Sequence, residues 1–200
     1  MARSRPKALV ILMVKAPLPG TVKTRLSRRV GATEALRFYR VTTDRLIRNL
    51  ARDTRWQLVL AVSPDNRRCA TFWPASLPRL AQGPGALGTR MARLLHASPG
   101  RPIVLIGSDI PGLRACHVAS ALKKITGANL VLGPAGDGGF WLIGRHARPL
   151  RRGIFDGVRW STEFAMVDTV RNWSGPVDIA PCLRDVDTVE DYLLWRQKLL

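Results

Sequence analysis

The run ALVILMV, residues 8–14, is followed at once by KAPLPGTVKTRL, residues 15–26. Seven consecutive apolar residues that stop at a stretch with two prolines and a glycine are typical of a strand buried on both faces that ends in a tight loop. Lys15, Lys23 and Arg25 place three positive charges in that loop. The sequence therefore predicts a buried first strand that carries a basic loop able to bind an anion. The alternative is a solvated basic loop with no ligand.

Three further apolar runs extend this pattern along the chain, at residues 56–62, 102–106 and 129–133. Each is short enough to be a buried strand. Before each run, apolar residues recur at spacings of three and four, at residues 36–50, 87–95 and 118–125, as in amphipathic helices. Strands that alternate with helices predict parallel strands joined by helical crossovers, with ligands bound beyond the carboxyl ends of the strands.

The composition is compatible with one domain over residues 1–200, because a chain with 46% hydrophobic residues can bury a sizeable core. The formal net charge is +18 and the pI is about 11.5. This charge favours an acidic partner, such as nucleic acid, an anionic membrane or a phosphorylated small molecule. Only six of the 32 basic residues are lysines, so an arginine-rich genome composition explains the charge equally well. The basic residues are dispersed along the chain, which argues against a nucleic-acid-binding tail.

The cysteines and the amino-terminal residues indicate the cellular compartment in which the protein is expected. Cys69, Cys116 and Cys182 are far apart in the sequence and form no CxxC pair, so we expect neither a zinc site nor a disulfide framework. Basic residues precede the first apolar run, as in a signal peptide, but a lysine and a proline follow where a small-residue cleavage site belongs. No run approaches the ~18 apolar residues of a membrane span. We therefore expect a soluble, cytoplasmic protein without a membrane span.

A carboxylate follows the third predicted strand, in GSDIP, residues 107–111. Asp109 at this position is suited to bind Mg²⁺ or Mn²⁺ together with phosphate oxygens and water. An aspartate that precedes a proline is equally typical of a helix N-cap. The local sequence leaves both interpretations open.

A glycine-rich segment, GPAGDGGFWLIG at residues 133–144, surrounds Asp137 and continues into the strand-like residues 140–143. Glycines of this density indicate a backbone that approaches a ligand closely, although a plain hairpin turn also explains Asp-Gly. Ser161 and Thr162 follow Trp160 and are expected either to contact a phosphate or to cap the next helix. Asp187 precedes a predicted carboxyl-terminal helix, for which Thr188 and Asp191 fit a capping box.

Taken in order, six segments resemble the bacterial glycosyltransferase-like family of the nucleotide-diphospho-sugar transferase superfamily, also called radical-SAM/selenodomain-associated transferases. The segments are KAPLPGTVKTRL, QGPGALGTRM, GSDIP, GPAGDGGFWLIG, RWST and DVDT. The resemblance covers residues 8 to about 195 and extends to the phospholactate guanylyltransferases. It implies a single-domain, Rossmann-like α/β fold of the GT-A type, with a mostly parallel central sheet flanked by helices and a nucleotide site at the carboxyl edge of the sheet.

The resemblance also implies roles for individual residues. Lys23 and Arg25 would hold the nucleotide phosphates and act in catalysis together with Asp109. Asp109 would bind the metal, with Asp187 as a second ligand. Ala86 stands where the family commonly has an acidic residue before the Leu-Gly pair. The remaining residues expected to contact the nucleotide are Lys15, Pro19, Gly20, Gln82 and Gly83, of which the last two would lie at the base. Those expected to line the acceptor pocket are Asp137, Gly138, Gly139, Ser161 and Thr162.

The resulting prediction is a transferase that uses a nucleotide-diphosphate donor with Mg²⁺ or Mn²⁺. The preferred reaction is glycosyl transfer, in which the metal and the cationic loop stabilise the leaving nucleoside diphosphate. The second is nucleotidyl transfer, in which a small phosphorylated acid attacks the α-phosphate and pyrophosphate leaves. The third interpretation is a basic nucleic-acid-binding protein, whose affinity would fall steeply with salt. The sequence leaves open the donor base, the small-molecule acceptor and the oligomeric state.

Overall fold

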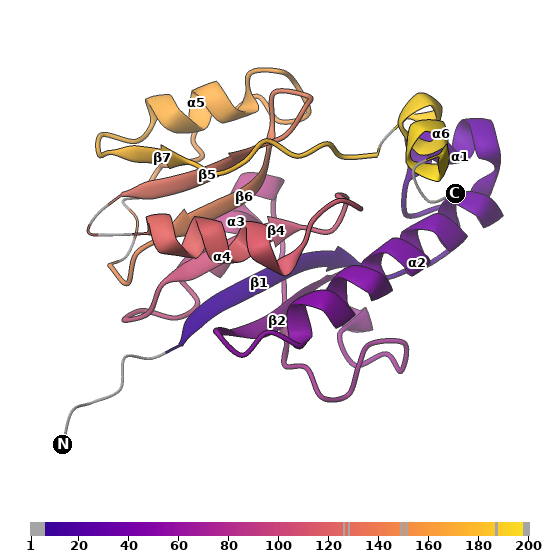
Figure 1. Cartoon of the computed structure of the whole chain (residues 1–200), viewed down its shortest axis with the longest axis horizontal. Helices are drawn as coiled ribbons and strands as arrows, with labels where there is room; N and C mark the ends of the chain where they lie inside the picture. Colours follow the sequence, from indigo (N-terminus) through magenta and orange to yellow (C-terminus); the bar gives the residue numbers. More distant parts are fainter. Residues whose placement is uncertain are drawn as a thin grey trace.

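The computed structural model describes residues 7–125, 127, 129–148, 150, 152–186 and 188–197. Within this part of the chain, seven strands form one sheet in the order β3-β2-β1-β4-β6-β5-β7 (Figure 1). The strands are β1 (Ala8–Lys15), β2 (Trp56–Ser63), β3 (Arg79–Ala81), β4 (Ile103–Gly107), β5 (Leu130–Pro134), β6 (Phe140–Arg145) and β7 (Val177–Ile179). The helices are α1 (Thr24–Val30), α2 (Ala32–Ala51), α3 (Leu87–Leu95), α4 (Ala115–Lys124), α5 (Ala165–Arg171) and α6 (Val189–Gln197), with a short 3₁₀ turn, η1 (Asp65–Arg67).

The sheet is parallel except at β6, which runs antiparallel to both β4 and β5. Leu12 of β1 is paired with Leu60 of β2 on one side and with Ile106 of β4 on the other. The prediction of a mostly parallel sheet flanked by helices is confirmed. The direction of β6 follows from its connection, because the short turn of residues 135–139 can join antiparallel strands but is too short for a parallel crossover. The hairpin interpretation of the glycine-rich segment is therefore also confirmed.

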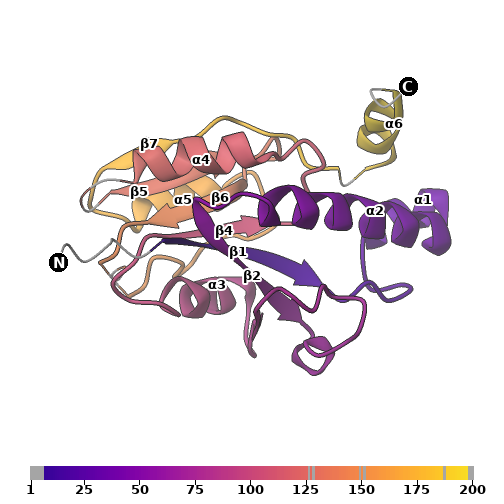
Figure 2. The ribbon, with the colours of Figure 1, turned by 60° about the horizontal axis from the view of Figure 1, so that its bottom comes forward.

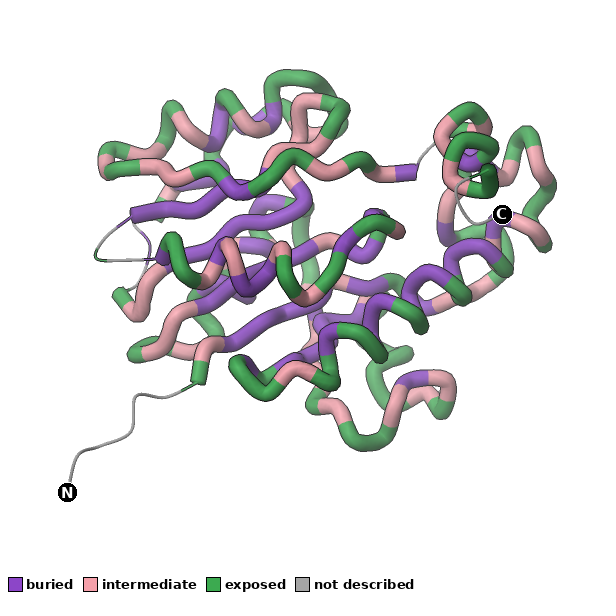
Figure 3. Tube along the Cα trace, in the orientation of Figure 1, coloured by how far each residue is buried: buried purple, intermediate pink, exposed green. Residues whose placement is uncertain are grey.

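The two faces of the sheet are covered by different helices (Figures 1 and 2). Val10 and Leu12 of β1 pack with apolar side chains of α2 and α4. Leu9 and Ile11, which point the other way, pack with side chains of α3 and α5. The central strands are buried along most of their length (Figure 3), as continuous apolar runs between two helical layers require. The helices predicted from residues 36–50, 87–95 and 118–125 are the crossovers α2, α3 and α4.

A third apolar cluster lies beyond the carboxyl edge of the sheet, where α6 packs against α1 and α2 (Figure 1). Phe38 of α2 meets the ring of Tyr192 edge to face, with 5.4 Å between the centroids. Thr188 and Asp191 exchange hydrogen bonds at the start of α6, as the predicted capping box requires. This cluster fixes the segment after β7 above the strand ends. Within the described residues, no helix is long and apolar enough to span a membrane.

Candidate functional site

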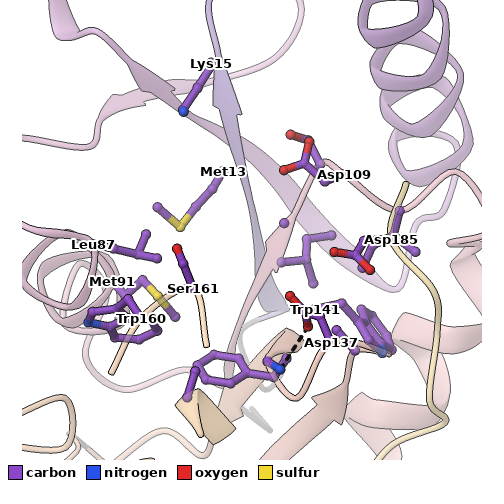
Figure 4. Close-up of a pocket in the computed structure, with 18 of the residues that line it drawn as sticks. Met13, Lys15, Leu87, Met91, Asp109, Asp137, Trp141, Trp160, Ser161 and Asp185 are labelled. Carbon is purple, nitrogen blue, oxygen red and sulfur yellow. Dashed lines mark hydrogen bonds between the residues drawn. The ribbon is translucent and has the colours of Figure 1, made fainter. Parts of the chain in front are cut away.

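A cleft of about 650 Å³ opens at the carboxyl ends of β1 and β4 (Figure 4). Its walls come from the loop that joins β1 to α1, the first turns of α3, the turn between β5 and β6, the segment before α5, and Asp185 after β7. Neighbouring parallel strands end at the same edge of the sheet, so residues far apart in sequence meet here. The cleft brings together these predicted site residues: Lys15, Lys23, Arg25, Gln82, Asp109, Asp137, Gly139, Ser161 and Thr162.

The predicted basic loop is shorter than expected, because Lys15 is the last residue of β1 and Arg25 lies in the first turn of α1. The side chains of Lys15 and Arg25 are exposed and line the cleft. Pro19 and Gly20 lie in the exposed turn of the same loop and do not line the cleft. The predicted role of these two residues is thus restricted to shaping the turn.

Lys23 differs from the other cations of the loop, because its side chain is only 4% exposed. Its Nζ donates a hydrogen bond of 2.7 Å to the carbonyl oxygen of Val186 and lies 3.1 Å from Oδ1 of Asp109. Its backbone is left-handed, with φ of +48°, a conformation that costs a non-glycine residue of order 1 kcal/mol or more. Lys23 therefore joins three segments: the basic loop, the end of β4 and the chain after β7.

Asp109 lies two residues after the end of β4, and its carboxylate is 53% exposed. The capping interpretation of this residue is wrong. The next helix, α4, begins only at Ala115, and its N-cap residue is Arg114. The segment between them is a turn in which the amide of Leu113 donates to the carbonyl of Ile110. Asp109 thus presents an accessible carboxylate to the cleft, paired on one side with Lys23.

Tyr39 fixes the end of β1 from behind the cleft. Its hydroxyl donates to the carbonyl of Lys15 at 2.9 Å and accepts from the amide of the same residue at 2.8 Å. Burial raises the pKa of the Tyr39 hydroxyl, and the negative charge of Asp109 acts in the same direction. The phenol therefore stays protonated and holds the strand end from which the basic loop departs.

Three carboxylates, those of Asp109, Asp137 and Asp185, line the cleft (Figure 4). Oδ1 of Asp137 accepts a hydrogen bond from the amide of Gly139 at 2.9 Å, so this side chain is oriented by its own turn. Among the described residues, no group of three or more His, Cys, Asp or Glu side chains is arranged to hold a metal ion. Asp187, the predicted second metal ligand, lies outside the described residues. The carboxylates present fit a Mg²⁺ or Mn²⁺ ion that takes its other ligands from phosphate oxygens and water.

Gln82 follows β3 and is buried. Its side-chain nitrogen donates to the carbonyl oxygens of Val14, at 3.1 Å, and Ala61, at 2.9 Å. Only the side-chain carbonyl is then left to contact a base. Gly83 does not line the cleft, and its amide donates to Asp65. Arg90 adds another cation to the cleft, and its guanidinium donates to the carbonyl of Gly85 at 2.7 Å.

The segment that carries Ser161 and Thr162 is held tightly. The guanidinium of Arg159 donates two hydrogen bonds to the carboxylate of Asp168, and the Arg159 backbone amide donates a third. These contacts lower the pKa of Asp168 to about 2, with the guanidinium as the main cause. Ser161 is left-handed, with φ of +62°, and its side chain is exposed to the cleft. The hydroxyl of Thr162 bonds to the carbonyl of Arg159 and to the amide of Phe164, so it supports this turn.

Gly138 joins the β5–β6 turn to the same segment. Its φ is +82°, and a Cβ at this position would lie 2.3 Å from the carbonyl oxygen of Glu163. Its own carbonyl accepts from the amide of Met166 at 3.2 Å. Gly138 does not line the cleft, and it allows the close packing that positions Asp137 opposite Ser161.

Among the cleft residues that sequence reasoning missed are Tyr39, Arg90 and Asp185. Arg90 and Asp185 stand inside motifs that were recognised, QGPGALGTRM and DVDT, so the motifs contained a signal for them. Tyr39 was recognised only as part of the apolar stripe of a helix. Nothing in the local sequence shows that its hydroxyl reaches the end of β1.

The mostly parallel sheet and the charged cleft at its carboxyl edge define an α/β protein with the fold of the nucleotide-diphospho-sugar transferases. The chain belongs to the family DUF2064, described as "Uncharacterized protein conserved in bacteria", whose model matches residues 46–162. No curated protein matches the chain in sequence.

Solved structures support the same fold. A "putative nucleotide-diphospho-sugar transferase" from Desulfovibrio desulfuricans G20 is 29% identical, with a TM-score of 0.85 over 96% of this chain and 88% of that one. The 4-diphosphocytidyl-2C-methyl-D-erythritol synthase of Anaerococcus prevotii DSM 20548 is 8% identical, with a TM-score of 0.62 over 98% and 99%. Rv0371c of Mycobacterium tuberculosis H37Rv, solved in complex with manganese, is 17% identical, with a TM-score of 0.54 over 96% and 98%.

Proposed function

We propose that this protein is a metal-dependent transferase that uses a nucleotide-diphosphate sugar as donor, and that residues 1–200 form one domain with this function. The observation that carries the proposal is the arrangement of charge in the cleft. Lys15 and Arg25 line it together with Asp109 and Asp185, at the strand ends where open α/β sheets bind their ligands. The similarity to the Desulfovibrio protein, described as a nucleotide-diphospho-sugar transferase, agrees with this assignment.

The proposed roles follow from the exposure and contacts of each side chain. Arg25, as an exposed guanidinium, binds phosphate oxygens as a fork, and Lys15 adds a point charge. Lys23 contributes its charge from a buried position and holds Asp109 in place. Gln82 contacts the base through its side-chain carbonyl, with Gly83 behind it. Asp137, Gly139, Ser161 and Thr162 face the acceptor, supported by Gly138.

The proposed metal ion is Mg²⁺ or Mn²⁺, held by Asp109 with a second carboxylate, either Asp187 or Asp185, and by the donor phosphates. The manganese complex of Rv0371c, which shares the fold, supports a divalent ion at such a site. When bound, the ion would neutralise negative charge on the leaving diphosphate. The residues of this chain would orient the diphosphate and exclude water from it, so that most of the catalytic effect is electrostatic.

The second candidate is nucleotidyl transfer from a nucleoside triphosphate to a small phosphorylated acid. The observation that favours it is the number of cations, because Lys15, Lys23, Arg25 and Arg90 all line the cleft and suit three phosphates better than two. The two reactions release different products: a nucleoside diphosphate in glycosyl transfer and pyrophosphate in nucleotidyl transfer. Product analysis therefore distinguishes them.

Calorimetric titration tests the proposal. The full chain is titrated with GTP, UTP, CTP, ATP and their diphosphate sugars, with Mg²⁺, with Mn²⁺ and with a chelator. We expect binding that requires the metal, and we expect Asp109→Asn to weaken the metal-dependent part about tenfold or more, or about 1.4 kcal/mol. Asp44→Asn is the matched control, because Asp44 is an exposed aspartate on α2 that does not line the cleft.

Two results would reject the proposal. The first is the absence of nucleotide binding under all metal conditions. The second is a metal dependence in Asp109→Asn equal to that of the parent. Binding of nucleic acid that weakens steeply with salt and tolerates Asp109→Asn would instead favour the basic nucleic-acid-binding interpretation.

A further inference from the structure

The cleft has a charged end and an apolar end. Figure 4 shows Asp109, Asp137 and Asp185 on one side, and Met13, Leu87, Met91 and Trp160 on the other. The two ends of the cleft are built from different parts of the fold. Met13 of β1 and Leu105 of β4 belong to the face covered by α3 and α5, whereas the charged residues come from loops beyond the strand ends. The side chains of the apolar end are Met13, Leu87, Met91, Leu105, Phe140 and Trp160.

The aromatic wall of this end is fixed in place. Trp160 packs against Phe140, with ring centroids 6.1 Å apart, and against Phe155, at 5.6 Å. Gly88 of α3 lies directly behind it, and a Cβ on Gly88 would lie 3.1 Å from the Trp160 ring. The neighbouring Arg159 is tied to Asp168 by three hydrogen bonds. The indole is thus held as a rigid surface before any ligand arrives, which lowers the entropic cost of binding a flat group.

Leu87 lies on the same side of the cleft as Trp160 (Figure 4); it is the first residue of α3, and 43% of it is exposed. The cleft therefore leaves an accessible leucine and the half-buried thioether of Met13 near a fixed indole, whereas Met91 is only 6% exposed. Apolar surface of this kind gains free energy when a ligand covers it. A ligand with a planar or branched apolar body would complete this end of the cleft.

Figure 4 shows Lys15 on the same side of the cleft as these side chains, beyond Met13. Ser161 is the polar side chain that Figure 4 places beside Met13, Leu87 and Met91. Arg90 is close in sequence, but its guanidinium donates to Gly85 and, at 3.5 Å, to Ser63 at the carboxyl end of β2. A nucleotide base needs hydrogen-bond partners along its edge, and a phosphorylated acid needs cations. The apolar side chains at this end offer neither hydrogen-bond partners for a base nor cations for a phosphate.

We propose that the apolar end is the acceptor subsite, and that its acceptor is an alcohol with an uncharged aromatic or branched apolar body. The hydroxyl of Ser161 binds the polar end of this acceptor, and Trp160 and Leu87 contact its apolar body. This inference rests on the proposed transferase function and deepens it. It favours glycosyl transfer to an uncharged alcohol over nucleotidyl transfer to a phosphorylated acid.

The test uses the full chain with two probes, 2-phenylethanol and glycerol 3-phosphate, titrated by ligand-observed NMR in the presence of nucleotide and the diamagnetic ion Mg²⁺. Leu87→Asn is compared with Leu193→Asn, an equally exposed leucine on α6 that does not line the cleft. We expect 2-phenylethanol to bind more tightly than glycerol 3-phosphate. Leu87→Asn should weaken it about three- to tenfold, or about 0.7–1.4 kcal/mol, because less than half of the leucine remains to be covered. Leu193→Asn should have no effect.

Nucleotide binding is measured in the same variants by calorimetry. If the parent binds nucleotide but Leu87→Asn weakens the nucleotide rather than 2-phenylethanol, the apolar end holds the base and the acceptor assignment is overturned. Tighter binding of glycerol 3-phosphate, or no binding of 2-phenylethanol, overturns it as well. Loss of nucleotide binding in the parent is a different result, because it rejects the proposed function itself.

Discussion

Replacement of Lys23 by methionine tests whether this residue is a structural connection as well as a phosphate ligand. The substitution keeps an unbranched stem of similar length and removes only the ammonium group. That group donates to the carbonyl of Val186 at 2.7 Å and lies 3.1 Å from the carboxylate of Asp109. Without it, the segment after β7 loses the hydrogen bond from Lys23 to Val186.

The magnitude follows from the two contacts. A hydrogen bond from a charged donor contributes about 1.5–3 kcal/mol, and here its loss leaves a carbonyl without this donor. The ion pair adds only about 0.2–1 kcal/mol, because the carboxylate of Asp109 is 53% exposed and screened by solvent. We expect Lys23→Met to lower the free energy of unfolding by about 2–3 kcal/mol. For a chain of this size, each kcal/mol shifts Tm by about 2–4 °C, so Tm should fall by about 4–12 °C.

Urea unfolding and thermal melts of the ligand-free protein measure this effect. Lys15→Met is the control, because Lys15 is an exposed lysine at the end of β1, where the same loop begins, and the effect of its replacement should stay within about ±0.5 kcal/mol. If Lys23→Met is as stable as Lys15→Met, the contacts of Lys23 contribute nothing measurable, and its role reduces to that of a mobile phosphate ligand.

Two other predictions concern the walls of the cleft. Arg25→Ala should weaken nucleotide binding about tenfold by calorimetry while stability changes by no more than about 0.5 kcal/mol, since the side chain is exposed; unchanged affinity would remove Arg25 from the phosphate site. Asp168→Asn should lower stability at neutral pH, because Arg159 holds the pKa of Asp168 at about 2, below its usual value of about 3.8. A carboxyl group whose pKa is lower in the folded than in the unfolded protein stabilises the fold at pH values above its unfolded-state pKa. This stabilisation is lost as the pH falls through the folded-state pKa. The difference in urea midpoint between parent and variant should therefore be constant above about pH 5 and shrink toward pH 2, and a difference independent of pH would contradict the assignment.

The central part of the fold was predictable because its strands and helices have sequence patterns that extend over many residues. β1, β2, β4 and β5 are buried on both faces and appear as continuous apolar runs, and α2, α3 and α4 carry apolar residues at helical spacing. β3 and β7 have three residues each, too few for a period to be recognised. The position of β6 between β4 and β5 depends on long-range pairing, which no local pattern contains.

The site was predictable where a strand end determines the position of a side chain, as at Asp109. Site residues whose side-chain position depends on the conformation of a loop were less predictable. The sequence places Lys23 in the basic loop, but only the left-handed backbone of that residue turns its ammonium group toward Asp109 and Val186. Gln82 was expected to lie at the base. Its nitrogen bonds instead to two strand carbonyls, which a one-dimensional pattern cannot reveal.

The segment after β7 has a consequence for biosynthesis. Six of the seven strands in the described part of the chain lie before residue 146, so most of the sheet can form while later residues are still being translated. Lys23 and Val186 are 163 positions apart, and the backbone of Val186 also bonds to Asp109. The charged wall of the cleft is therefore completed only when Asp185 and Val186 have left the ribosome. A nascent chain that stops after β7 would contain the sheet without a finished site, so premature translation products should fold in large part yet not compete for the ligand.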